Sequence, residues 1–259
     1  MTTKARPRVG FFSTASCEGC QLAVLECERE LPALFERVEI VRFREASSYE
    51  GREIGEEYLD VAFVEGSVTR EKDAEEVREI RRRCGVLVAL GACAATCGLN
   101  AMKNLRPLSE SRTEVYGESA DWYDTFPTRP VAAIAQVDYT LRGCPIDRVE
   151  FLRFLTFLLR DLPFPAPKRP VCSECKSAGV VCRMVLGQPC LGPVTTCGCG
   201  AICTRYGRSC EGCRGLLADA NIAGIAYAWK RLGAERSLLD HRLNLFNAYT
   251  MASRKKANA

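Results

Sequence analysis

Several features that many enzymes depend on are scarce or missing in this sequence. Histidine occurs once, as His241, and no G-x-S-x-G motif is present, so we do not expect an acid–base or nucleophilic enzyme. Neither G-x-G-x-x-G nor a Walker motif occurs, so the chain itself is not expected to bind NAD(P) or ATP. We expect His241 to be a surface residue.

Long apolar runs are missing too. The longest, around 151–159, is interrupted by Arg153 and is shorter than the roughly 18 residues that a membrane helix needs. The N-terminus has neither a signal-peptide apolar region nor a twin-arginine signal, which predicts a cytoplasmic protein without a membrane partner. Lysine and arginine are scattered among acidic residues, so we expect no nucleic-acid partner.

Cysteine, in contrast, is abundant, with sixteen among 259 residues. In a reducing cytoplasm disulfides are not expected, so such a content indicates metal or redox chemistry. Nine of the sixteen lie between Cys172 and Cys213, a Gly-rich segment too short to bury them all as ordinary core residues. Thiolates at this density predict iron–sulfur clusters.

The first 165 or so residues alternate between strand-like and helix-like patterns, which predicts an α/β fold with a mostly parallel, flavodoxin-like sheet. Strands are expected at 9–12, 38–43, 59–64, 86–90 and either 131–137 or 139–141, and helices at 20–30, 71–83 and 146–160. Closely spaced prolines from Pro163 to Pro170 form a non-helical linker. The predicted domains are a flavodoxin-like domain (1–166), a small cysteine-rich, ferredoxin-like two-cluster domain (167–215) and a helical tail (216–259).

Four cysteines of the first domain follow predicted strands. Cys17 and Cys20 come after the strand at 9–12, Cys93 follows the strand at 86–90, and Cys144 follows the fifth strand. The carboxyl ends of parallel strands meet at one edge of a sheet, so these cysteines are expected to converge on one cluster. Neighbouring glycines, Gly19, Gly91 and Gly143, would let the backbone pass close to it.

The second domain repeats the theme. Its cysteines form two groups of four, with spacing C-x2-C-x6-C in the first and C-x6-C-x2-C closing the second. The eight candidate ligands are Cys172, Cys175, Cys182, Cys190, Cys199, Cys203, Cys210 and Cys213. They suffice for two 4Fe–4S clusters, although one ligand of each group can cross to the other cluster, and two zinc sites are the main alternative. Three 4Fe–4S clusters would lower the formal net charge from +4 to about −2.

The motifs SCEGCQL, GACAATCG and GCPIDRVEFL resemble those of the small subunits of NiFe hydrogenases. The related subunit of respiratory complex I has adjacent cysteines where this chain has Cys17 and Cys20 separated by two residues, which favours the hydrogenases. The resemblance implies that Cys17, Cys20, Cys93 and Cys144 bind the 4Fe–4S cluster nearest to a nickel–iron centre. That centre would lie in a separate large subunit, the first expected partner.

The later motifs VCSECK, GQPCLGPVTTCGCGAIC and CEGCRG, with REASS, VEGSVTRE and LFNAY, resemble the small subunits of cytosolic hydrogenases coupled to nicotinamide nucleotides. This resemblance implies three 4Fe–4S clusters that relay electrons between the large subunit and FAD/iron–sulfur subunits that reduce NAD(P)+. A heterodisulfide-reductase-type partner is the alternative within the family. From another class, the alternatives are an iron–sulfur carrier without hydrogenase activity and a zinc scaffold.

The remaining cysteines are not expected to be ligands. We expect Cys27 to be buried, and Cys84 to end the charged helix and to be buried as well. Cys97 should lie close to the first cluster without binding it, and Cys197, beside Cys199, should not be a ligand. Two arginines flank Cys144, Arg142 and Arg148. Surface ion pairs are the expected role for both, and compensation of the cluster's negative charge is the alternative.

Overall fold

The computed structural model describes residues 6–47 and 58–257. The first five residues of the N-terminal segment and Ser48 of the REASS motif lie outside the described ranges. Among the described helices, none is long and apolar enough to cross a membrane.

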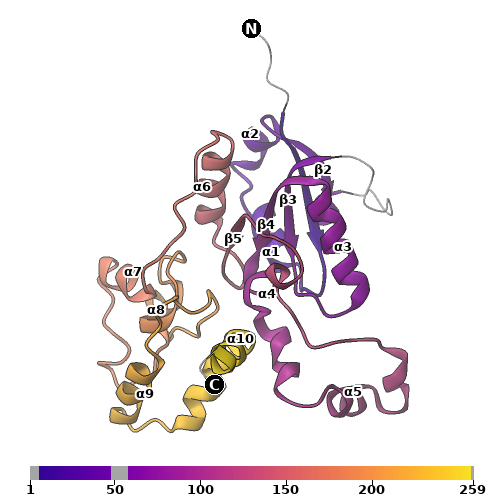
Figure 1. The fold of residues 1–259 in the computed structure, drawn as a ribbon. Helices are drawn as coiled ribbons and strands as arrows, with labels where there is room; N and C mark the ends of the chain where they lie inside the picture. Colours follow the sequence, from indigo (N-terminus) through magenta and orange to yellow (C-terminus); the bar gives the residue numbers. More distant parts are fainter. Residues whose placement is uncertain (1–5, 48–57, 258–259) are drawn as a thin grey trace.

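A five-stranded parallel sheet forms the N-terminal half, with strand order β2-β1-β3-β4-β5 (Figure 1). The strands are β1 (Arg8–Ser13), β2 (Glu39–Phe43), β3 (Leu59–Glu65), β4 (Cys84–Leu90) and β5 (Tyr139–Leu141). This is the order of doubly wound sheets of the flavodoxin type, in which ligands lie beyond the carboxyl ends of the strands.

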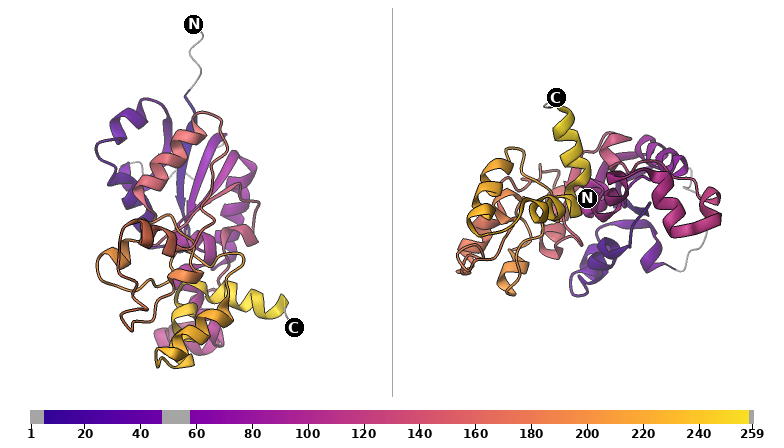
Figure 2. Two further views of the ribbon diagram at one scale, coloured as in Figure 1. Left: turned by 90° about the vertical axis from the view of Figure 1, so that its left-hand side faces the viewer. Right: turned by 90° about the horizontal axis from the view of Figure 1, so that it is seen from below.

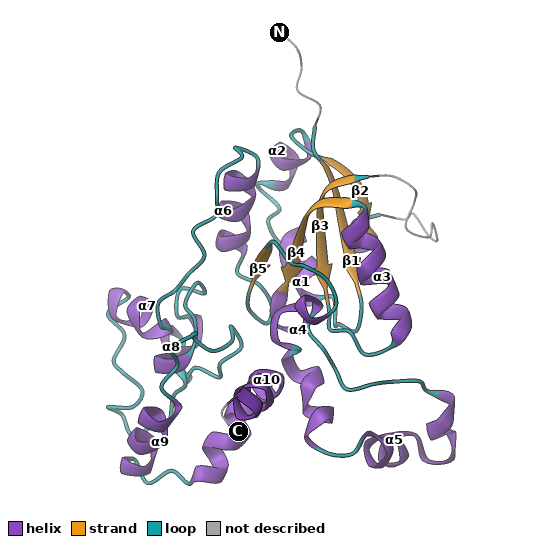
Figure 3. Cartoon of the chain, in the orientation of Figure 1, coloured by secondary structure: helices purple, strands orange, loops and turns teal. Residues whose placement is uncertain are grey.

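Helices cover both faces of the sheet (Figure 3). They are α1 (Gly19–Leu25), α2 (Leu31–Phe35), α3 (Glu71–Arg82), α4 (Gly91–Thr96), α5 (Leu108–Tyr116) and α6 (Arg148–Leu158), joined by the 3-10 helices η1 (Arg44–Ala46), η2 (Gly98–Leu105), η3 (Gly117–Trp122) and η4 (Val131–Ala133). Alternate strand residues point to opposite faces, so Phe63 packs toward α1 and α6 whereas Val64 packs toward α3. Both side chains are fully buried, and the two faces form two separate apolar cores.

The C-terminal half contains α7 (Val171–Ser177), η5 (Gly192–Val194), α8 (Ile202–Arg205), α9 (Ile222–Arg231) and α10 (Arg236–Ala257), with long loops between α7 and α9. A third apolar core spans Leu191, Leu216, Trp229 and Leu243, so the helical tail packs on the cysteine-rich region across the predicted boundary at 215. Helix α10 also contacts α4 and η2, and it lies between the two halves of the molecule (Figure 2).

Several predicted elements have different boundaries in the structure. The helix expected at 20–30 ends at Leu25, and a separate helix begins at Leu31, where Pro32 occupies the first turn. Cys84 does not end the charged helix but begins β4, paired with Leu59. The fifth strand is at 139–141, and the last sheet-domain helix begins at Arg148 because the Asp147 side chain accepts a hydrogen bond from the Glu150 amide.

Candidate iron–sulfur centres

The cysteines predicted for the first cluster lie together beyond the carboxyl ends of the strands. Cys17 is in the loop after β1, Cys20 is in the first turn of α1, Cys93 is in α4 directly after β4, and Cys144 follows β5. The loops are tied to one another, since the Ala92 amide donates to the Gly143 carbonyl at 2.7 Å. We call Cys17, Cys20, Cys93 and Cys144 the sheet-edge group.

Glycines make this convergence possible. A Cβ at Gly91, where φ is +85°, would overlap Cys20 Sγ, and a Cβ at Gly98 would lie 3.1 Å from Cys93 Sγ. Gly91 follows β4 whereas Cys20 begins α1, so the missing side chain lets two distant loops meet.

Burial and nearby negative charges raise the pKa values of Cys20, Cys93 and Cys144 in the metal-free chain. Burial, and then the neighbouring Cys144 and Cys17, raise the pKa of Cys93 to about 12. The pKa of Cys20 is raised by burial and by Glu65, with smaller contributions from Cys93 and Cys144. The contributions of Cys144 and Cys17 to the Cys93 pKa, and of Cys93 and Cys144 to the Cys20 pKa, reflect the closeness of these thiols at the sheet edge. A metal bound there would have to displace protons.

Glu65 is a buried carboxylate of this site that the sequence analysis missed. It ends β3 at 2% exposure, and its two oxygens accept hydrogen bonds from the amides of Cys20 at 3.2 Å and Gln21 at 3.0 Å. Burial raises the pKa of Glu65, and the two amides oppose that shift. Glu65 thus fixes the first turn of α1, where Cys20 lies. The one available signal was an acidic residue at the end of the apolar run 61–64.

A second set of cysteines lines one pocket in the C-terminal half. Cys172, Cys175, Cys182 and Cys190, which we call the outer group, surround it together with Val171, Met184 and Pro193. Burial raises the pKa of Cys172 to about 11, and Cys190, Cys182 and Cys175 contribute in that order. The first four cysteines of the region therefore stay together.

The remaining four predicted ligands, Cys199, Cys203, Cys210 and Cys213, form the inner group. Burial raises the pKa of Cys213 to about 11, with further contributions from Cys199 and Cys203. Cys210 is buried, and its thiol interacts with Cys213 and with Cys190 of the outer group. Cys197 is also buried, and its backbone amide donates to the Arg169 carbonyl.

The three groups touch in series. Arg214, the residue after Cys213, donates to the carbonyl of Arg142, two residues before Cys144, at 2.5 Å, which places the inner group beside the sheet-edge group. The Cys210 amide donates to Cys190 Sγ at 3.2 Å, which joins the inner group to the outer group. The order in space is thus sheet-edge, inner, outer, whereas in the sequence the outer group precedes the inner one.

A buried ion pair fastens the junction between the two halves. Arg214, directly after Cys213, donates to Glu150 Oε1 at 2.8 Å, and the two side chains are 1% and 7% exposed. Its other nitrogens donate to the carbonyls of Cys197 at 2.7 Å and Arg142 at 2.5 Å. A Cβ at Gly198 would overlap the Arg214 guanidinium, so glycine makes room for the pair.

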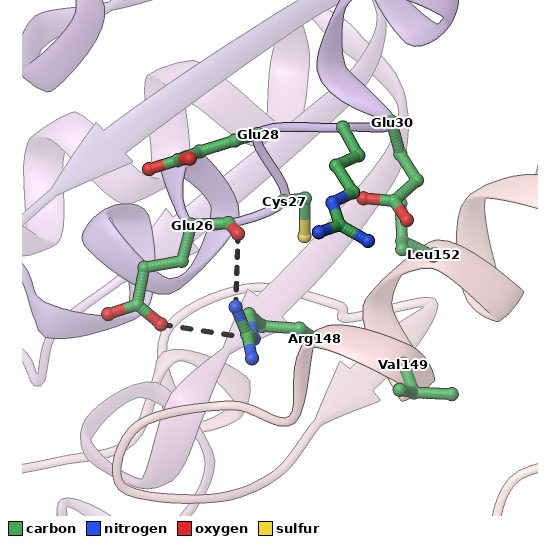
Figure 4. A pocket seen from close by; sticks show the side chains of 8 residues that line it. Glu26, Cys27, Glu28, Glu30, Arg148, Val149 and Leu152 are labelled. Atoms are coloured by element: carbon green, nitrogen blue, oxygen red, sulfur yellow. Dashed lines mark hydrogen bonds and ion pairs between the residues drawn. The ribbon is translucent and has the colours of Figure 1, made fainter.

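The arginines that flank Cys144 have different surroundings. Arg148 forms the expected surface pair, with its Nε 3.9 Å from Glu26, beside a pocket lined by Cys27 and Glu30 (Figure 4). Arg142 does not form a surface pair: burial and the nearby Arg214 lower its pKa, and its guanidinium lies beside Gly215. The expectation of a surface pair for Arg142 was therefore wrong.

Helix α10 contributes to the inner group from outside the cysteine-rich region. It kinks at Asn247, which is fully buried and whose Nδ2 donates to the Gly212 carbonyl at 3.2 Å, between Cys210 and Cys213. One residue earlier, the Phe246 carbonyl accepts a hydrogen bond from Thr96 of α4 at 3.0 Å. The kink thus connects both halves.

The cysteines outside the three groups are placed as follows. Cys27 and Cys84 are buried, as expected, and fully buried Cys97 lies beside Cys93. Among the residues that the structure describes, no three His, Cys, Asp or Glu side chains are close enough to hold a single metal ion. A multi-iron cluster does not require such closeness, because each thiolate binds a different iron.

Known proteins match this chain over much of its length. The family described as "NADH ubiquinone oxidoreductase, 20 Kd subunit" matches residues 17–158. Sulfhydrogenase 2 subunit delta of Pyrococcus furiosus is 34% identical over 226 residues, which cover 87% of this chain and 93% of that protein. A subunit of the F420-non-reducing hydrogenase vhu of Methanococcus voltae is 28% identical, with 94% and 95% covered. A chain in the crystal structure of an NAD+-reducing [NiFe]-hydrogenase in the H2-reduced state is 29% identical with a TM-score of 0.55, covering 62% of this chain and 96% of that one.

Proposed function

The chain belongs to the family of NiFe hydrogenase small subunits, and we propose that it relays electrons, with three 4Fe–4S clusters as carriers, from a NiFe-containing large subunit to a cytoplasmic electron acceptor. The sheet-edge, inner and outer groups would each hold one cluster with four thiolates. Iron–sulfur clusters supply one-electron transfer when bound.

The observation that carries this proposal is the serial contact of the three groups. The Arg214–Arg142 hydrogen bond joins the inner group to the sheet-edge segment, and the Cys210–Cys190 hydrogen bond joins the inner group to the outer group. A scaffold that needed only structural metal would not require its sites to touch in a line from the sheet edge to the surface. We assign one group of four thiols to each cluster, and an exchange of Cys190 and Cys210 between the inner and outer clusters is the alternative.

The chain's own residues would hold the carriers and control their surroundings. Apolar Val171, Met184 and Pro193 line the pocket of the outer group, and the Cys210 amide donates to Cys190 Sγ. Burial and hydrogen bonds to sulfur are the means by which proteins set cluster potentials. The flavodoxin-like description of 1–166 is supported by the strand order, and the ferredoxin-like description of 167–215 by its two sets of four thiols.

For the acceptor we propose FAD/iron–sulfur subunits that reduce NAD(P)+. Support comes from the NAD+-reducing hydrogenase, whose matched chain is covered over 96% of its length. A heterodisulfide-reductase-type acceptor, the alternative that the family resemblance implies, is the second candidate, and the relative named as an F420-non-reducing hydrogenase subunit matches almost the whole chain.

Purification of the complex without oxygen tests the proposal. We expect nickel and flavin in copurifying subunits, and about twelve iron and twelve sulfide in this chain. Two zinc ions without iron, or the absence of a nickel-bearing partner, would contradict it.

The variant Cys93→Ala tests the wiring. It should abolish hydrogen-dependent NAD(P)+ reduction while the paramagnetic signals of the other two clusters persist, since only the sheet-edge group contains Cys93. Retained hydrogen-dependent reduction would show that electrons do not need the sheet-edge group.

A further inference from the structure

The surface around the outer group is unusually apolar. Val181, Val185 and Leu186, in the loop after α7, are 59%, 80% and 52% exposed. Ile202 and Tyr206, at the two ends of α8, are 54% and 81% exposed. Large apolar side chains that gather in this way mark interaction sites in water-facing proteins.

The loop and α8 form one continuous face. Arg183 Nη2, in the loop, donates to the Thr204 carbonyl of α8 at 2.9 Å. Both residues line the pocket of the outer group, together with Cys182. In Figures 1 and 2 this region lies at the end of the molecule opposite α3 and α5. We call Val181, Val185, Leu186, Ile202 and Tyr206 the exit face.

The rim of the exit face is positively charged. Lys176, Arg205 and Arg208 are exposed around it. Between residues 162 and 210 the sequence contains one acidic residue, Glu174. Its carboxylate is held inward by the amides of Gly198 at 2.7 Å and Ala201 at 3.2 Å. The rim therefore presents cations without neighbouring exposed carboxylates of the same segment.

The outer group also comes nearest to solvent at this face. Cys182 is exposed, whereas Cys190 of the same group and Cys210 of the inner group are buried. A redox protein seated on the exit face would thus lie beside the outer thiols.

We infer that the exit face docks an electron-accepting iron–sulfur protein whose surface is acidic around an apolar centre. This inference rests on the proposed function and adds the chemistry of the acceptor. A second copy of this chain does not fit, because two such rims would place cations against cations. At each encounter one electron leaves the reduced subunit and reduces the docked protein by one electron, and no atom is exchanged.

The test uses the purified complex of this chain with its large subunit, reduced by hydrogen and mixed with one of three oxidants. These are an acidic plant-type ferredoxin, the basic protein cytochrome c, and the small dye methyl viologen. Lys176→Glu/Arg205→Glu should lower the bimolecular rate constant for the ferredoxin about tenfold at low salt and raise that for cytochrome c. The matched pair Arg37→Glu/Lys72→Glu, at exposed positions before β2 and on α3, should change neither.

The outcomes separate the inference from the proposed function. Equal effects of the two pairs on ferredoxin, or none, would overturn the docking inference, as would binding of the complex to anionic lipid vesicles through the exit face. If the Lys176→Glu/Arg205→Glu variant loses iron, the salt dependence of the wild-type complex tests the inference instead. Added salt must lower the bimolecular rate constant of the wild-type complex with ferredoxin and must not lower that with cytochrome c. Failure of the wild-type complex to reduce the dye would instead overturn the proposed function.

Discussion

At the scale of residues, two glycines in the left-handed region give space to sulfur and to charge. The missing side chain of Gly91 leaves room for the Cys20 thiol, and that of Gly198 leaves room for the Arg214 guanidinium. In each case the space is filled by a residue distant in sequence, so a small substitution acts on a site elsewhere in the chain.

Gly91→Ala should therefore disable the sheet-edge group alone. The added Cβ would overlap Cys20 Sγ, so we expect iron content to fall by about a third while the inner and outer clusters keep their spectra. Gly233→Ala is the matched control, because φ there is also positive, +77°, and no atom lies within 4 Å. Iron counting and paramagnetic resonance make the comparison, and full iron content in Gly91→Ala would refute the close approach.

Removal of the Arg214 side chain should lower the free energy of unfolding, because the buried Glu150 carboxylate then has no cation beside it. Arg214→Met leaves Glu150 unpaired, which we expect to destabilise the chain by about 3–5 kcal/mol and lower the apparent Tm by about 10 °C. Arg214→Met/Glu150→Met should recover most of that loss, since neither charge is then buried alone. Thermal unfolding of the loaded variants checks this, and equal Tm values for the single and double variants would contradict it.

At the scale of elements, α10 holds the two halves together. It packs on α4 and η2 of the sheet domain, and its residues Leu239 and Leu243 complete the core with Trp229. The kink at Asn247 allows one helix to contact both halves, with a side-chain hydrogen bond to the loop between two inner-group cysteines.

Asn247→Ala should weaken the inner group specifically. Loss of the hydrogen bond to the Gly212 carbonyl leaves a buried acceptor unsatisfied, which costs about 1–3 kcal/mol. We expect a changed potential for the inner cluster in a redox titration followed by paramagnetic resonance, with the sheet-edge cluster unchanged. Asn244→Ala, one turn earlier on the same helix, is the control, and identical titrations of the two variants would rule out this role.

The sequence predicted the elements whose signal is local. Apolar runs such as 59–64 and 86–90 are strands because both faces of a parallel sheet are buried, and cysteines after those strands meet at the sheet edge. Periodicity did not reveal the break after Leu25. Nor did it reveal Glu65 or the Arg214–Glu150 pair, because these depend on contacts between residues 44 to 64 positions apart.

At the scale of the whole molecule, the buried thiols make the metal-free chain sensitive to alkali. In the folded chain the pKa is raised to about 12 for Cys93 and to about 11 for Cys172 and Cys213. Unfolded thiols titrate near about 8.5, so their contribution to stability is full below that pH and is lost as pH rises toward the folded values. Denaturant unfolding of the reduced, metal-free chain should therefore give a smaller free energy at about pH 10 than at about pH 7.5.

The loaded chain provides the control for this prediction. Its thiols have already lost their protons to solvent on binding metal, so the same rise in pH should leave its resistance to denaturant nearly unchanged. A metal-free chain whose stability is flat or rises over this range would show that its thiols are not protonated in the folded state.

The mismatch between spatial and sequence order has a consequence for biosynthesis. As the polypeptide leaves the ribosome, the sheet-edge quartet is complete at Cys144 and the outer quartet at Cys190, whereas the bridge between them awaits Cys213. The nascent chain thus contains the complete sheet-edge and outer groups before the inner group, which lies between them in space, has been synthesised. In the proposed relay, electrons could therefore pass along the chain only after translation of Cys213, and α10 is translated later still.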